Sequence, residues 1–142
     1  MIHKTAIVNS KAKISSNVEI GPYAVIGPDV EIDDDVIIQS HVNITGNTKI
    51  GKKNIFYPMS SIGSSPQDLK YKGEKTKLTI GNGNTIREHV TINTGTIQDN
   101  GITRIGNHNL IMIGSHIAHD CIVGNNIVMA NNSAIAGHAT VE

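Results

Sequence analysis

The sequence is poor in the large side chains that fill most hydrophobic cores. Its 142 residues include no tryptophan, one phenylalanine and three tyrosines, and 38% of them are hydrophobic. A core without large rings must be built from branched aliphatic side chains in small, repeated layers. The length is sufficient for one domain, and we expect residues 1–142 to form it.

Excess charge, paired cysteines and long apolar runs are also missing. Twelve Lys and Arg residues balance twelve Asp and Glu residues, which argues against non-specific nucleic-acid binding because that needs a basic surplus. The single cysteine, Cys121, excludes an intrachain disulfide and suits a reducing compartment. No signal peptide is visible, and no run approaches the roughly 18 apolar residues of a membrane span. We therefore expect a cytoplasmic protein without a membrane span.

An aliphatic or aromatic residue returns at every sixth position through the first half of the chain. The series is Ile2, Val8, Ile14, Ile20, Ile26, Ile32, Ile38, Ile44, Ile50, Phe56 and Ile62. Four residues after most of them stands a small or β-branched residue, as at Ala24, Val30 and Val42. A helix would scatter this series around its axis, since six residues advance it by about 600°.

A short strand followed by a turn keeps such a series on one side. The β-branched residues favour strands, and Gly and Asn tolerate left-handed turns. Three units make a triangular coil of 18 residues, and stacked coils pair in parallel. The period therefore predicts an all-β fold, a parallel β-helix.

The six-residue period is interrupted twice. It stops after Ile62, resumes in phase at Ile80, and restarts one residue out of phase at Ile105. We expect protruding loops at about residues 64–77 and 94–101. Binding residues concentrate on loops carried by a rigid scaffold, although tolerated insertions would give the same break.

The densest group of chemically capable residues is G-S-H-I-A-H-D-C, residues 114–121. One coil of 18 residues separates His119 from Gly137, and His138 follows. The coil geometry thus gathers His116, His119, Gly137 and His138 within about two strand spacings. A neutral histidine is the usual general base.

Neighbouring groups complete this candidate site. Asp120 would orient the His119 ring, and the Gly137 backbone N–H would face a developing oxyanion. Gln67, Asp68 and Lys70 lie in the first loop. Cys121 falls at a small inward position, so we expect it in the core. Zinc is the other use of clustered histidines, but it requires three good ligands.

Four blocks of the sequence resemble the UDP-N-acetylglucosamine acyltransferases of lipid A biosynthesis, which are hexapeptide-repeat acyltransferases. The blocks are Q-D-L-K-Y-K-G-E (67–74), N-T-I-R-E-H-V-T-I (84–92), N-L-I-M-I-G-S-H-I-A-H-D-C (109–121) and A-I-A-G-H (134–138). The resemblance implies a left-handed coil, against the general right-handed preference of parallel crossovers. It also implies further coils and a helical C-terminal region that are absent from these 142 residues, so we expect a fragment or a truncated chain.

The resemblance implies transfer of a 3-hydroxyacyl chain from acyl carrier protein to the 3-hydroxyl of UDP-N-acetylglucosamine, the first step of lipid A synthesis. It implies a homotrimer with sites between subunits, direct attack, and no metal or cofactor. The implied catalytic residues are the base His119, its support Asp120 and the oxyanion donor Gly137. The implied substrate-binding residues are Gln67, Asp68, Lys70, His116 and His138.

Other interpretations stay open. A relative that acylates a UDP-sugar nitrogen would share the fold and the base. A γ-class carbonic anhydrase also shares the fold, but its zinc-binding histidines are more widely spaced than the H-x-x-H here. An inert trimeric scaffold is the non-enzymatic alternative. The sequence departs from the resembled family at Asn93-Thr94, where His-Arg is frequent, and this removes positive charge near the cleft.

Overall fold

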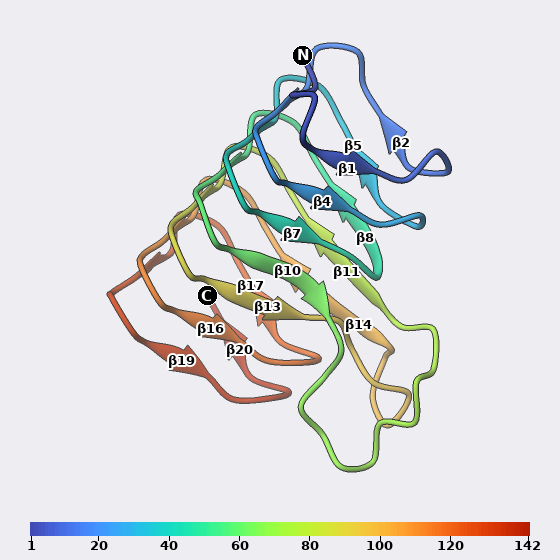
Figure 1. The fold of residues 1–142 in the computed structure, drawn as a ribbon. Coiled ribbons are helices and arrows are strands. Elements are labelled where there is room, and N and C mark those ends of the chain that lie inside the picture. Colours follow the sequence, from blue (N-terminus) through green and yellow to red (C-terminus); the bar gives the residue numbers. More distant parts are fainter.

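The computed structural model describes residues 1–142 as short strands wound into a three-sided stack of coils (Figure 1). The strands form three parallel sheets, two with seven strands and one with six, and no segment is helical. The predicted all-β, left-handed parallel β-helix is confirmed. No helix of the length and apolar character of a membrane span is found.

Each wall of the stack is one sheet. Sheet 1 contains β1 (Ile7–Val8), β4 (Val25–Ile26), β7 (Asn43–Ile44), β10 (Ser61–Ser64), β13 (Thr91–Asn93), β16 (His116–Ile117) and β19 (Ala134–Ile135). Sheet 2 contains β2 (Lys13–Ile14), β5 (Glu31–Ile32), β8 (Asn47–Ile50), β11 (Lys77–Ile80), β14 (Ile102–Ile105), β17 (Ile122–Val123) and β20 (Thr140–Val141). Sheet 3 contains β3 (Glu19–Ile20), β6 (Ile37–Ile38), β9 (Ile55–Phe56), β12 (Thr85–Ile86), β15 (Leu110–Ile111) and β18 (Val128–Met129).

The hexad residues form the core because each strand turns them inward. In sheet 1, Ile26 pairs with Ile44 and Ile44 with Ile62, and none is more than 1% exposed. Burial of such a side chain contributes about 1.5–3 kcal/mol. The change of phase leaves the core intact, since Ile92 still pairs with Ile117 across the inserted segment.

One corner of the interior is polar, which the hexad pattern did not predict. Asn54, Asn84 and Asn109 are buried where a small or β-branched residue was expected. Asn84 Nδ2 donates to the Gly106 carbonyl (2.9 Å), and Asn84 Oδ1 accepts from the Asn109 N–H (2.9 Å). The Asn84 N–H donates in turn to Asn54 Oδ1 (2.8 Å). This asparagine ladder satisfies backbone groups that the turns leave inside the prism.

The turns use the expected Gly and Asn, with six glycines at positive φ, but they also use other residue types. Eleven non-glycine residues adopt positive φ, and Asn is only two of them. His41, His89 and His108 are among the eleven, as are the candidate site residues Asp120 (φ 62°) and His138 (φ 65°). A left-handed corner residue thus carries each of these two side chains, one coil apart.

Two longer connections leave the stack at the same corner (Figure 1). The flap, residues 65–76, joins β10 to β11, and loop 94–101 joins β13 to β14. They contact each other through Thr76 Oγ1, which donates to Thr94 Oγ1 (3.0 Å). The Gly95 N–H donates to the Lys77 carbonyl (3.1 Å). The flap and loop 94–101 therefore lie beside the turn that carries His119 and Asp120.

Candidate active site

His119 and Asp120 form a hydrogen-bonded pair at the turn between β16 and β17. The Nδ1 atom of His119 lies 2.9 Å from Oδ2 of Asp120. The Asp120 side chain is 1% exposed and the His119 side chain 13%. The buried Asp120 therefore holds the imidazole ring through Nδ1. The opposite edge of the ring, which carries Nε2, points away from Asp120.

Loop 94–101 fixes the Asp120 carboxylate. Oδ1 accepts the Thr96 backbone N–H (2.8 Å), and Oδ2 accepts the Thr96 hydroxyl (2.6 Å). The Asp120 N–H donates to Thr103 Oγ1 (2.8 Å). Because both carboxylate oxygens act as acceptors, we assign the proton of the His119 contact to Nδ1. That assignment leaves a lone pair on His119 Nε2.

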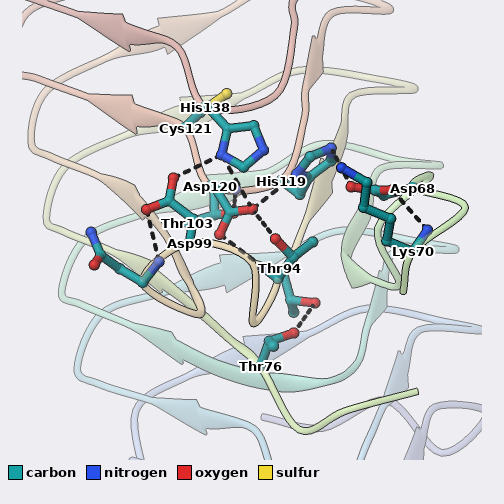
Figure 2. A network of polar contacts seen from close by, with 12 residues as sticks. Asp68, Lys70, Thr76, Thr94, Asp99, Thr103, His119, Asp120, Cys121 and His138 are labelled. Atoms are coloured by element: carbon teal, nitrogen blue, oxygen red, sulfur yellow. Dashed lines mark hydrogen bonds and ion pairs between the residues drawn. The ribbon is translucent and has the colours of Figure 1, made fainter. Parts of the chain in front are cut away.

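The flap brings Asp68 to this free nitrogen. Asp68 Oδ2 lies 3.9 Å from His119 Nε2, beyond hydrogen-bonding distance. Its other oxygen, Oδ1, accepts the backbone N–H of Lys70 (2.9 Å), which fixes the carboxylate within the flap. Figure 2 shows Asp68 and Lys70 on one side of His119, opposite the Asp99 carboxylate. Gln67 and Lys70 are exposed.

The next coil places His138 and Gly137 against His119. The two imidazole rings lie edge to face, with centroids 4.9 Å apart. A Cβ atom on Gly137 would lie 2.5 Å from His119 Cε1 and 2.6 Å from Nε2. No residue other than glycine fits at position 137 without displacing the ring.

His116 lies in β16 of sheet 1, and its side chain contacts the neighbouring strand β13. Its Nδ1 atom lies 2.7 Å from Thr91 Oγ1, across the pairing of β13 with β16. Burial lowers the pKa of His116, the Thr91 contact opposes this, and a positive charge on His119 lowers the pKa further. His116 therefore favours the neutral form in which one ring nitrogen accepts a hydrogen bond.

Residues 11–46 and 102–137 match the family described as bacterial transferase hexapeptide (six repeats). The chain belongs to this family.

Solved structures of other proteins superpose closely on the chain. LpxA from Acinetobacter baumannii is 52% identical over 98% of the chain, with a TM-score of 0.97. LpxA, a UDP-N-acetylglucosamine acyltransferase from Bacteroides fragilis, is 44% identical over 99%, with a TM-score of 0.96. UDP-N-acetylglucosamine acyltransferase from Campylobacter jejuni is 40% identical over 99%, with a TM-score of 0.94. The chain spans 54%, 55% and 54% of these proteins, respectively.

The fold places most of the sequence-predicted site residues together. Asp68, Asp120, Gly137 and His138 all lie around His119, and His138 also lies 3.8 Å from Asp120. Lys70 reaches the group only through its backbone contact with Asp68. Cys121 is buried, and burial raises the pKa of its thiol.

Sequence reasoning missed the residues of loop 94–101 that hold the site. Thr96 supports Asp120, and Asp99 Oδ2 lies 2.7 Å from His138 Nδ1. The break in the hexads marked the loop but not these side chains. Asn93 and Thr94, at the departure from His-Arg, are buried, and Asn93 Oδ1 has no hydrogen-bond partner.

The side chains of His119, Asp120 and His138 could also hold a metal ion, since one ligand atom of each lies within 4.8 Å of the others. In the structure, however, both Asp120 oxygens already accept hydrogen bonds from Thr96. A cation at Oδ2 would have to replace the Thr96 hydroxyl or the His119 contact, which are both on this oxygen. The hydrogen-bond pattern instead favours a base and its orienting carboxylate.

Proposed function

We propose that the chain catalyses transfer of a 3-hydroxyacyl group from acyl carrier protein to the 3-hydroxyl of UDP-N-acetylglucosamine. One observation carries the proposal: His119 is tied through Nδ1 to the buried Asp120 and presents Nε2 toward Asp68. The similarity to proteins named UDP-N-acetylglucosamine acyltransferase supplies the substrate class.

His119 acts as the general base in this proposal. Nε2 takes the proton of the attacking sugar hydroxyl, and the new imidazolium charge is stabilised by Asp120 through Nδ1–H. The sugar oxygen attacks the thioester carbonyl directly. Cys121 is excluded as a nucleophile because it is buried and its thiol pKa is raised.

The remaining groups bind the substrate. Asp68, facing Nε2, accepts a hydrogen bond from the sugar and orients its hydroxyl toward the base. His116 and His138 offer further ring nitrogens, and Gln67 and Lys70 are exposed on the flap for contact with the nucleotide. The Gly137 N–H makes no hydrogen bond within the chain, which supports its role as oxyanion donor.

A homotrimer is part of the same proposal. The outward face of sheet 3 is largely apolar: Ile37 pairs with Ile55, Leu110 pairs with Val128, and Thr85 stands between these two pairs. Sheet 2 instead presents Lys13, Glu31 and Lys49 outward, joined by exposed ion pairs. An apolar column of this kind is suited to contact between subunits. We place the reaction in the cytoplasm, where the free thiol of Cys121 stays reduced.

The test is product formation by the purified chain. Incubation with 3-hydroxyacyl carrier protein and UDP-N-acetylglucosamine should give an O-acylated sugar nucleotide, detected by mass spectrometry. His119→Ala should abolish it, whereas His3→Ala, at an exposed histidine distant in sequence, should not.

Three other outcomes would overturn this function. An amide formed with a UDP-amino sugar, and no ester, would identify a nitrogen-acylating relative. Bound zinc with carbon dioxide hydration would identify a carbonic anhydrase. No product with any of these substrates would identify a scaffold.

A further inference from the structure

The second carboxylate of the site, Asp99, comes from loop 94–101 and binds His138. Asp99 Oδ2 lies 2.7 Å from His138 Nδ1. Asp99 Oδ1 accepts the Asn100 N–H (2.8 Å), so both oxygens are engaged (Figure 2). The hydrogen bond from His138 lowers the pKa of Asp99. The carboxylate is therefore charged near neutral pH and accepts the Nδ1 proton of His138.

His138 has another acceptor close by. Its Nδ1 atom lies 3.8 Å from Asp120 Oδ2, the same oxygen that binds His119 (2.9 Å) and Thr96 Oγ1 (2.6 Å). This oxygen already accepts two donors. A His138 ring released from Asp99 would therefore turn toward Asp120 and compete with His119 for it.

We propose that Asp99 is a positioning residue that holds His138 away from the Asp120–His119 pair. It keeps the His138 proton on Nδ1 and leaves His138 Nε2 as an acceptor for substrate. The catalytic part of this inference rests on the proposed function.

Asp99 is not needed to hold its loop in place. Thr96 anchors the loop to Asp120 through two hydrogen bonds. Thr94 binds the flap through Thr76, and the Gly95 N–H binds Lys77. Loss of the Asp99 carboxylate should therefore change the state of His138 while the fold is kept.

The test compares Asp99→Asn and Asp99→Glu with a control, Gln98→Ala, at the exposed neighbouring residue. Nitrogen NMR of the His138 ring should show the Nδ1–H tautomer in the wild type, a mixture in Asp99→Asn, and recovery in Asp99→Glu. We expect kcat to fall about 10- to 100-fold in Asp99→Asn, the range for carboxylates that orient active-site histidines in metal centres. The thermal midpoint should not change.

A second comparison, made in the His138→Gln variant, separates a positioning role of Asp99 from a general loss of activity. In His138→Gln, the further change Asp99→Asn should lower kcat by less than about twofold, because the ring that it positions is gone. An unchanged His138 tautomer in Asp99→Asn would overturn the proposal, as would an equal loss of kcat in the His138→Gln background. A wild-type protein that transfers no acyl group would refute the proposed function, while the NMR measurement still decides the Asp99–His138 pairing.

Discussion

At the scale of single residues, the site depends on how little space surrounds His119. Gly137 lies under the ring, Asp120 lies beside it, and both are fixed by coil geometry. The roles of these residues follow from their neighbours in space. A lone histidine at position 119, without the buried carboxylate, would be an ordinary surface residue.

The Gly137→Ala variant tests this tight packing. The added methyl group would lie 2.5 Å from His119 Cε1, so the ring must move from the substrate. We expect kcat to fall by about 10²–10³, comparable to the loss of an oxyanion donor. The control is Gly27→Ala, where the nearest atom would be 3.4 Å away. Equal steady-state activity of the two variants would contradict the account.

At the scale of strands and turns, the asparagine ladder links successive coils. Asn84→Ala would leave the Asn109 N–H and the Gly106 carbonyl without their partners inside the prism. Each unsatisfied group costs about 1–3 kcal/mol. We expect the free energy of unfolding to fall by about 2–5 kcal/mol, measured by urea denaturation. The exposed Asn131→Ala should change it by less than about 0.5 kcal/mol.

The elements were predictable to the extent that they repeat. The inward residues follow from a period of six, since a parallel β-helix buries the same position in every coil. The left-handed turns were less predictable, because positions such as Tyr23 and Met59 carry no signal of positive φ. His119 and His138 could be paired from the coil length alone. Asp99 could not, because an irregular loop gives no register from which to place a side chain.

At the scale of the whole molecule, the three walls differ in chemistry. Sheet 1 carries the outward-facing His116, sheet 2 carries charged pairs, and sheet 3 carries the apolar column of Ile37, Ile55, Leu110 and Val128. The proposed trimer buries the apolar column and leaves the charged wall in solvent. The His119 turn joins sheet 1 to sheet 2 and lies opposite sheet 3. A contact through sheet 3 alone therefore does not place the site between subunits, contrary to the expectation from the sequence, and it can be tested separately from the site.

The double variant Ile55→Lys and Leu110→Lys places two charges on the apolar wall. Burying an unpaired charge in a subunit contact costs several kcal/mol, so we expect the trimer to become a monomer in sedimentation experiments. The control Ile122→Lys makes a similar change on the exposed face of sheet 2 and should leave the trimer intact. A double variant that remains trimeric would exclude sheet 3 as the contact.

The most direct measurement is the pH dependence of kcat/KM for the wild type and His119→Gln. A general base must be unprotonated to act, so the wild-type value should fall as the pH is lowered. We predict that His119→Gln lowers kcat/KM by about 10²–10⁴ and removes this acidic limb. A variant within about tenfold of the wild type, with the same limb, would show that another group accepts the proton.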